Sequence, residues 1–532
     1  MLLSLVRTLI HGGLWTGTLE TLPISKGALL AKPLIQDLTY TNPNIGAGAA
    51  GSSAAFHLRQ YALQEDIAIN ITVFEKTDRI GGRSLTVPAY DDPSLPIELG
   101  ASIFVGANPI LVNASRQFQL PVSEPHRLDK DDMTAIWDGV NFVFQTTEGS
   151  WGGWDLAKMF WRYGLSPYRV KKLVDGMVGE FLKLYEDPCF PFKSLTQRAE
   201  ELGLNRMTSL TGEQVLKEAV SLATDNAMSV ESGNWRIFDE MILESGAAVY
   251  RNVTVSSIEK FKTKTQSSRP SKYVIATKSA HAKDDTAENY GVEFDNVIIA
   301  NPWQFSNIKA GEGVLEREID EIPYTKLHVT LFTSALELNP EFFGLKPGSK
   351  APATVYTTLA EDEAGGQGAD GVGRTGFYSI STLKYVVNPK TGQRERVYKI
   401  FSPKAVTAQF LTSIFATAIP ESVISGEEQD EDKTFEPISW YYPHSFYSYP
   451  IELPRVTFED PVIGKGVYYT SGIESFISCM ETSALMGRNV ARLIADKFAG
   501  ISRPDDTFVE VDEKGPLEQE VEGIKVQAEG EL

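Results

Sequence analysis

The feature that most constrains this chain is a glycine-rich turn at residues 46–51, which reads Gly-Ala-Gly-Ala-Ala-Gly. Gly46 permits a tight turn, Gly48 lets the backbone approach a pyrophosphate, and Gly51 lets the following helix pack close to a sheet. The free N–H groups and the dipole at the start of such a helix favour phosphate groups. The spacing therefore predicts a turn that binds a dinucleotide.

The segments that follow the turn support this prediction. The alanine-rich stretch from Ala49 to Leu63 predicts a helix, and the alternating stretch from Ile69 to Phe74 predicts a strand that ends at Glu75. Glu75 follows Gly51 by 24 positions, where a carboxylate can accept hydrogen bonds from ribose hydroxyls. A turn, a helix, a strand and an acidic residue in this order predict a Rossmann-like α/β unit.

Two further segments favour FAD over NAD as the dinucleotide. Gly81-Gly82-Arg83, shortly after the predicted strand, is typical of flavoproteins of the glutathione-reductase-like and amine-oxidase-like type. Near the other end of the chain, Val467 to Glu474 predicts a strand that runs into a turn with a carboxylate. Met480 to Thr482 then predicts a helix turn whose N–H groups stabilise a reduced flavin.

We therefore predict FAD as the cofactor, with contacts from both ends of the chain. Glu474 is expected to be a cofactor ligand, and Glu481 is expected to be the carboxylate of the helix turn. The predicted FAD-binding residues are Gly46, Gly48, Ala49, Ala50, Gly51, Glu75, Lys76, Gly82, Arg83, Val255, Gly472, Glu474, Met480, Glu481 and Thr482.

Charge and composition exclude several classes of function. The formal net charge of −20 argues against nucleic acid and against an anionic membrane surface as main partners, since both need clustered Lys and Arg. At most a peripheral membrane association is expected. The two cysteines, Cys189 and Cys479, and the six scattered histidines show no metal-ligand spacing, so no metal site is predicted.

The 532 residues suffice for more than one unit. The predicted fold class is α/β: a Rossmann-like FAD-binding domain of the glutathione-reductase or amine-oxidase type, with an interleaved α+β substrate domain. The predicted ranges are 1–40 (leader or disordered), 41–150, 236–310 and 456–500 (FAD-binding), 151–235 (helical substrate part), 311–455 (second substrate part) and 501–532 (acidic disordered tail).

Apolar residues recur at helical spacing from Val170 to Tyr185 and predict an amphipathic helix. Several aromatic residues lie just before it. They either pack a helical cap or line an apolar pocket. The sequence leaves both roles open, because cores and pockets use the same residue types. These residues are Trp151, Trp154, Phe160, Trp161, Tyr163 and Tyr168.

Three stretches together resemble the prenylcysteine oxidase family (prenylcysteine lyase, farnesylcysteine lyase) of flavoproteins. They are Ile45 to Leu58, Glu75 to Phe104 with its Gly-Gly-Arg and Glu-Leu-Gly-Ala-Ser, and Gly466 to Asn489 with Gly-Ile-Glu and Met-Glu-Thr-Ser-Ala. Weaker similarities are Asp295 to Pro302 and Tyr398 to Ser402. The resemblance spans most of residues 45–500, and the C-terminal stretch is its most specific part.

The resemblance implies a thioether oxidase. A prenylated cysteine would bind with its isoprenoid tail in an apolar channel, and the flavin would take a hydride from the carbon next to sulfur. Water addition and collapse of the hemithioacetal would give cysteine and a prenyl aldehyde, while dioxygen reoxidises the flavin to give hydrogen peroxide. His444, in the similar stretch Tyr442-Pro443-His444, is a candidate for ordering water or binding the amino-acid end, although a structural role is the commoner one for a lone histidine.

The expected location is the secretory pathway, in a vacuolar or lysosome-like compartment. The resemblance implies such a compartment, and Asn70, Asn113 and Asn252 each begin an Asn-x-Ser/Thr triplet. Leu2 to Val6 is too short for an ordinary signal peptide, which leaves a cytoplasmic location as the alternative.

Two departures from the family pattern leave alternative functions open for this chain. The segment from Leu38 to Ile45 is polar and contains Pro43, so it predicts a damaged first strand. The connection from Lys217 to Ser232 is too short for the extra helical stretch that the family carries. The alternatives are a flavin-dependent oxidoreductase of specialised metabolism on the same scaffold and a non-catalytic, truncated product.

Overall fold

The computed structural model describes residues 40–123, 132–146, 161, 166–209, 227–261, 272–280, 288–363, 366, 368–425 and 436–503. Several predicted features lie outside these residues. They are the leader, most of the acidic tail, most of the aromatic stretch before Val170 and most of the short connection after Lys217.

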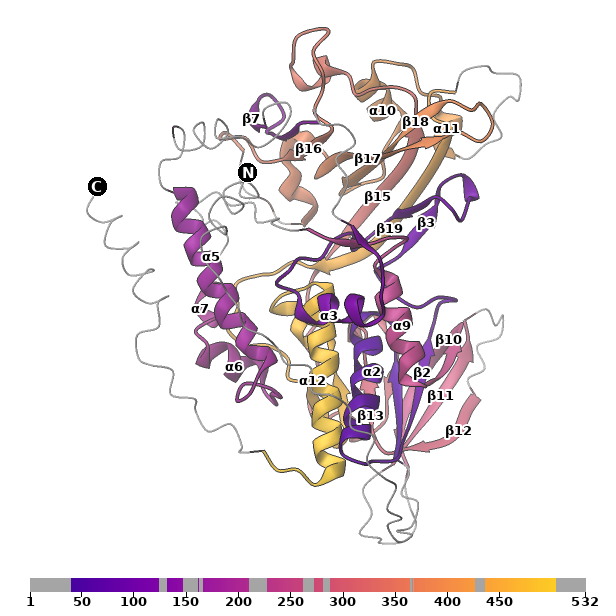
Figure 1. The fold of residues 1–532 in the computed structure, drawn as a ribbon, viewed down its shortest axis with the longest axis vertical. Helices are drawn as coiled ribbons and strands as arrows, with labels where there is room; N and C mark the ends of the chain where they lie inside the picture. Colours follow the sequence, from indigo (N-terminus) through magenta and orange to yellow (C-terminus); the bar gives the residue numbers. More distant parts are fainter. Residues whose placement is uncertain are drawn as a thin grey trace, which may run out of the picture.

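A six-stranded sheet forms the lower part of the molecule in Figure 1. Its order is β20 (Val462–Gly464), β21 (Val467–Tyr469), β13 (Val297–Ile299), β1 (Tyr40–Ile45), β2 (Ile69–Glu75) and β9 (Ala248–Arg251). All neighbours pair in parallel except β20 and β21. This sheet draws on four distant parts of the chain, as a doubly wound dinucleotide domain does.

The expectation of a damaged first strand is wrong. β1 pairs with β2 along all six of its residues and with β13 at Asn44 and Ile45. The N–H of Gly46 donates to the carbonyl of Phe74 in β2. Backbone N–H groups point to alternate sides along a strand, so the nitrogen of Pro43, three residues earlier, points towards β13. On that side β13 pairs only with the end of β1. The proline therefore removes no hydrogen bond from the pairing with β2.

Side-chain amides replace apolar packing on the helix-facing side of β1. The buried Asn44 donates to the carbonyl of Gly51 in α2 at 2.6 Å. The buried Asn42 accepts a hydrogen bond of 2.8 Å from Asn296, whose side-chain oxygen in turn accepts one from Lys497 of α12. These bonds satisfy one polar atom of each amide, whereas Nδ2 of Asn42 and Oδ1 of Asn44 are buried with no hydrogen-bond partner among the described residues.

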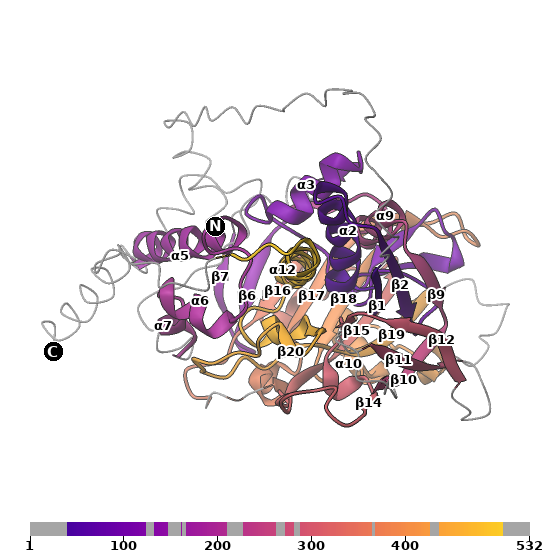
Figure 2. The ribbon, with the colours of Figure 1, turned by 90° about the horizontal axis from the view of Figure 1, so that it is seen from below.

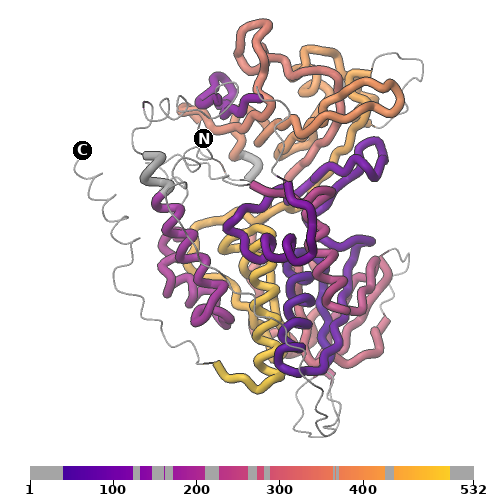
Figure 3. The backbone as a smooth tube through the Cα atoms, in the orientation of Figure 1, coloured from indigo at the N-terminus to yellow at the C-terminus, as the bar shows by residue number. Residues whose placement is uncertain are grey.

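Helices α2 (Ala49–Gln64) and α12 (Met480–Ala499) pack side by side against this sheet, as the indigo and yellow segments of Figure 3 show. They approach closely, because a β-carbon placed on Gly487 would lie only 2.1 Å from the carbonyl oxygen of Ala50. The hydroxyl of Ser53 also donates to the carbonyl of Ala484 at 2.6 Å. The first and last parts of the described chain thus form one core.

A four-stranded and a seven-stranded sheet form the other main layers, and Figure 2 shows the seven-stranded sheet behind α12 and α2. The four-stranded sheet has the order β12 (Glu288–Phe294), β11 (Tyr273–Ser279), β10 (Val253–Lys260) and β14 (Lys309–Ala310). The seven-stranded sheet has the order β19 (Trp440–Pro450), β15 (Tyr324–Ser334), β18 (Arg394–Ser402), β17 (Ser379–Val387), β16 (Thr354–Thr357), β6 (Thr134–Trp137) and β7 (Phe142–Gln145).

Short elements connect these layers. The small ladders pair β3 (Thr86–Pro88) with β4 (Pro96–Glu98) and β5 (Val122–Ser123) with β8 (Ser229–Val230). The other α-helices in the described part of the chain are α3 (Pro109–Gln117), α5 (Ser166–Leu182), α6 (Leu195–Glu201), α7 (Asn205–Thr208), α9 (Trp235–Ser245), α10 (Ala408–Phe415) and α11 (Glu421–Ser425). The 3-10 turns are η2 (Ala89–Asp91), η3 (Lys183–Tyr185), η4 (Trp303–Phe305), η5 (Pro340–Phe343), η6 (Gly368–Thr375) and η7 (Ser471–Ser475).

The seven-stranded sheet has two different faces. Its outer face shares a core with α10 and α11 and includes Phe332, Tyr398 and Ile400. Its inner face packs Leu327, Val329 and other apolar residues against the β3–β4 ladder. The inner face therefore looks towards the dinucleotide-type domain.

The predicted ranges of the two domains stay predictions, but the structure shows a finer exchange of chain between the layers. β6 and β7 precede residue 151 and belong to the seven-stranded sheet. Leu184 and Phe192, within the predicted helical part, share a core with α2 and α12. Among the described residues, no helix is long and apolar enough to cross a membrane.

The close contact of α2 with α12 predicts a large effect for Gly487→Ala. The added methyl group would meet the backbone of Ala50, so we expect a loss of about 3 kcal/mol in the free energy of unfolding. Gly179→Ala in α5 is the matched control, because its β-carbon meets open space and should stabilise by up to about 1 kcal/mol. Denaturant unfolding measures both, and equal effects would contradict the close packing.

Candidate functional site

Two glycine loops face each other at the carboxyl end of β1. A β-carbon placed on Gly82 would lie 3.1 Å from the α-carbon of Gly48, and one on Gly48 would lie 3.8 Å from the α-carbon of Gly82. Gly82 also has a positive φ of 59°. A side chain at either position would fill the space between the loops, so the glycines keep open a cradle beside the start of α2.

Glu75 lies next to this cradle at the end of β2. One oxygen of the buried carboxylate accepts the N–H of Ala47 at 2.8 Å, and the other accepts the N–H and the hydroxyl of Thr77 at 2.9 and 2.8 Å. Two other predicted residues lie differently. Lys76 is exposed, and Val255 is buried in the core of the four-stranded sheet.

Arg83 joins three distant parts of the chain. One guanidinium nitrogen forms an ion pair of 2.7 Å with Glu474 in η7, and the other donates to the carbonyl of Ser448 in β19 at 2.7 Å. The Tyr324 hydroxyl donates to the same Glu474 oxygen at 3.0 Å. Burial disfavours the charge on Arg83, but the attraction and hydrogen bond of Glu474 outweigh it, so the pKa of Arg83 is raised.

The start of α12 holds the last predicted segment. Cys479 caps the helix, and Thr482 completes a reciprocal capping box. The Glu481 carboxylate does not point along its own helix, because it accepts the N–H groups of Ile110 and Leu111 at the start of α3 at 2.9 and 3.0 Å. Burial raises the pKa of Glu481 to about 6. Glu481 therefore fixes α3 against α12.

These residues fit FAD. The glycine cradle and the start of α2 would hold the pyrophosphate, and Glu75 would hold the ribose. The buried hydroxyl of Ser84, next to Arg83, has no hydrogen-bond partner among the described residues, which gives the cradle a polar group for a ligand. Gly472 and Glu474 bring the C-terminal segment to the same place through the pair with Arg83.

A buried polar cluster that the sequence did not predict lies beside this site. Lys399 of β18 donates to the carbonyl of Glu98 at 3.0 Å and to the hydroxyl of Ser102 at 2.9 Å. The N–H of Asn234 donates to one Glu98 oxygen at 2.7 Å, and the other has no partner among the described residues. The cluster adjoins Arg83, since a β-carbon on Gly100 would lie 2.3 Å from the Arg83 carbonyl oxygen.

Burial perturbs both charged groups of this cluster. It raises the pKa of Glu98 to about 7, against the hydrogen bond from Asn234 and the attraction of Lys399. It lowers the pKa of Lys399 to about 8, against the attraction of Glu98. The cluster therefore changes its proton content near neutral pH. Its Glu-Leu-Gly-Ala-Ser and Tyr-Lys-Ile-Phe-Ser segments were visible in the sequence, but nothing there paired them.

Aromatic side chains cover part of the inner face close to Lys399, whose ammonium lies 4.7 Å from the ring centre of Phe401. Tyr356 and Tyr449 are 44% and 46% exposed, and partial burial raises the pKa of both phenols. Burial raises the pKa of Tyr378, and the nearby Tyr449 raises it further. We call Tyr356, Tyr378 and Tyr449 the inner-face tyrosines.

His444 lies in β19, next to the ring of Phe446 at a centroid distance of 5.6 Å. Burial lowers the pKa of His444, and the charge of Arg79 lowers it further. This pKa favours the neutral imidazole. Its role in ordering water or binding substrate stays a prediction. Among the described residues, no group of three or more His, Cys, Asp or Glu side chains is placed to hold a metal ion.

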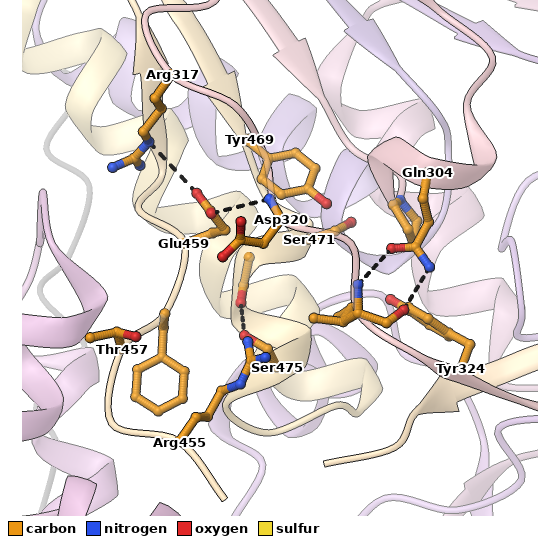
Figure 4. A pocket seen from close by; sticks show the side chains of 14 residues that line it. Gln304, Arg317, Asp320, Tyr324, Arg455, Thr457, Glu459, Tyr469, Ser471 and Ser475 are labelled. Carbon is orange, nitrogen blue, oxygen red and sulfur yellow. Dashed lines mark hydrogen bonds and ion pairs between the residues drawn. The ribbon is translucent and has the colours of Figure 1, made fainter. Parts of the chain in front are cut away.

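A polar cavity of about 290 Å³ lies beside η7 (Figure 4). Tyr324, Tyr469, Ser471 and Ser475 line it, together with charged side chains from the segments before β15 and before β20. Tyr324 connects this cavity to the Arg83–Glu474 pair through its hydrogen bond.

This chain matches sequence models of two known families and is similar to several characterised proteins. A sequence model described as Prenylcysteine lyase matches residues 146–219 and 214–506, and one for an NAD(P)-binding Rossmann-like domain matches residues 45–116. Farnesylcysteine lyase of Arabidopsis thaliana is 26% identical and covers 85% of this chain and 88% of its own. Prenylcysteine oxidase 1 of Mus musculus is 25% identical and covers 86% and 89%.

Among solved structures, wild-type putrescine oxidase bound to putrescine is similar over 86% of this chain and 99% of its own, at 14% identity and a TM-score of 0.46. The family matches confirm the predicted α/β fold class, the FAD cofactor and the class of FAD-dependent oxidoreductases.

The Glu98–Lys399 cluster predicts a pH dependence of stability. Because the folded pKa of Glu98 is raised to about 7, folded protein holds a proton between pH 4.5 and 7 that the unfolded chain has lost, and stability falls as the pH rises through this window. Between pH 5 and 8, wild type should lose about 2–3 kcal/mol more than Glu98→Gln.

Denaturant unfolding at a series of pH values measures this difference. Glu341→Gln, at an exposed position far from the cluster, should follow wild type. Parallel curves for wild type and Glu98→Gln would show that Glu98 does not carry the raised pKa.

Proposed function

This chain belongs to the prenylcysteine lyase family, and we propose that it is a thioether oxidase that cleaves prenylcysteine, with a farnesyl or geranylgeranyl group. The substrate and water would be converted to free cysteine and a prenyl aldehyde, and dioxygen would be reduced to hydrogen peroxide. Such a reaction would serve the breakdown of prenylated proteins. The names of the two relatives described above support the substrate class.

The observation that carries this proposal is the apolar inner face beside the FAD site. FAD, when bound, supplies the acceptor for the hydride. The protein then has to bind an isoprenoid tail, orient the carbon next to sulfur and keep bulk water away. Tyr356 and Tyr449 offer partly exposed aromatic surface for the tail, and Phe401 lies next to the ammonium of Lys399 on the same sheet.

Charged residues of this chain would position the ends of that reaction. The Arg83–Glu474 pair holds the loop after Gly82 against η7, so it fixes the two edges of the FAD site relative to each other. Lys399 presents an ammonium next to Phe401 and the inner-face tyrosines. Because its pKa is lowered to about 8, it can hold or release a proton near neutral pH.

Turnover of farnesylcysteine tests this proposal directly. Purified protein incubated with farnesylcysteine in air should release free thiol, aldehyde and hydrogen peroxide in equal amounts. Phe401→Ala should raise KM about tenfold or more by removing apolar surface near the tail. A protein that retains FAD and yields none of the three products would favour another flavin oxidoreductase on the same scaffold.

We also propose a secretory location, in a vacuolar or lysosome-like compartment, with at most peripheral membrane contact. Asn70 on β2 and Asn113 on α3 are exposed, so both side-chain amides are accessible for glycan transfer. Protein isolated from its natural cells should shift in gel mobility after glycosidase treatment, and Asn113→Gln should reduce the shift. No shift in wild type would favour the cytoplasmic alternative.

A further inference from the structure

The polar cavity beside η7 has a lining unlike the inner face. Its walls come from η4 and Pro302 before it, the segment before β15, the segment 455–459 and η7 itself. Figure 4 shows side chains of both charges around the opening. A volume of about 290 Å³ suits a small polar group, whereas an isoprenoid tail would leave these charges without solvent or partners.

Arg455 is the cation available to a ligand. Among the described residues, its guanidinium has no hydrogen-bond or ion-pair partner, and its side chain extends towards Ser475 in Figure 4. Arg317, the other guanidinium in the lining, is already engaged, since it pairs with Asp460 at 3.1 Å and with Glu459 at 3.6 Å. A carboxylate that enters the cavity therefore meets one unengaged guanidinium, the geometry that favours charge-assisted hydrogen bonds.

Carboxylates form the opposite side of the cavity. Glu459 accepts the N–H of Asp320 through one oxygen at 3.5 Å. Its other, buried oxygen is the one that pairs with Arg317 at 3.6 Å, and it accepts no hydrogen bond among the described residues. The side chain of Asp320 lies beside it in Figure 4. An ammonium group would find acceptors here. A ligand with one carboxylate and one ammonium, such as an α-amino acid, matches the two sides together.

The cavity is also connected to the cofactor segment. Tyr324 lines it and donates to Glu474, which pairs with Arg83. Gly472 forms part of the wall, and a β-carbon there would lie 2.5 Å from the carbonyl oxygen of Glu459. The polar cavity and the Arg83–Glu474 pair therefore share the turn η7.

We propose that this cavity binds the amino-acid end of the thioether substrate, with its α-carboxylate on Arg455 and its α-ammonium on Glu459 and Asp320. The inference rests on the proposed function, because it divides one substrate between a polar cavity and an apolar face. It assigns Arg455 and Glu459 as specificity residues outside the FAD site.

Three substrates and three variants test this assignment. The substrates are farnesylcysteine, its methyl ester, which lacks the carboxylate charge, and its N-acetyl derivative, which lacks the ammonium. Arg455→Met should raise KM about 10- to 100-fold for farnesylcysteine and leave KM for the methyl ester unchanged, with little effect on kcat. Glu459→Gln should raise KM for farnesylcysteine and leave KM for the N-acetyl derivative unchanged.

Arg394→Met is the matched control, because it removes the same charge at the beginning of β18, where Arg394 lies over the ring of Tyr385. It should leave all three KM values unchanged. Equal factors for acid and ester in Arg455→Met, or no change in either, would overturn the assignment.

A calorimetric titration with S-methyl-L-cysteine separates this inference from the proposed function. Wild type should bind it, and Arg455→Met should not. If wild type turns over no thioether but binds S-methylcysteine through Arg455, the thioether oxidase is wrong and the amino-acid site stands. If wild type turns over farnesylcysteine but binds S-methylcysteine no better than Arg455→Met does, the assignment of the cavity is wrong.

Discussion

The structure depends on the burial of a polar strand, β1, in the middle of the six-stranded sheet. β2 and β13 pair with its two edges, and the glycine turn that begins at Gly46 leaves its carboxyl end. The amides of Asn42 and Asn44 connect it to both ends of the helix layer, through Gly51 of α2 and, by way of Asn296, Lys497 of α12. Without these bonds the strand would bury four unsatisfied side-chain polar atoms instead of two, and the turn would lose its support.

The cofactor site follows from this arrangement because three segments meet at one end of β1. The turn at 46–51, the loop with Gly82 and Arg83, and η7 with Glu474 lie far apart in the sequence. The Arg83–Glu474 pair joins the last two, and the packing of α12 on α2 brings the third alongside. Around this junction the protein offers two environments, the aromatic inner face and the polar cavity, which suit the two chemically different ends of one thioether substrate.

The sequence predicted the parts of this site that depend on local spacing. The glycine turn, Glu75 and the C-terminal strand and helix each carry a short-range pattern that requires a particular backbone. It misjudged β1, because strand prediction values apolar side chains and cannot foresee that Asn42 and Asn44 find partners in distant helices. It also missed Glu98 and Lys399, whose contact spans 301 positions and exists only after the sheets pack.

We infer that three distant segments form one FAD site on this strand. The most direct test is the ratio of FAD to polypeptide in purified wild-type protein, with FAD supplied during purification. We expect about one tightly held FAD per chain, released only when the protein unfolds. The contrary result is a protein that unfolds cooperatively, as an intact fold does, but binds no FAD even when FAD is supplied. That result would show that the three segments do not form one FAD site.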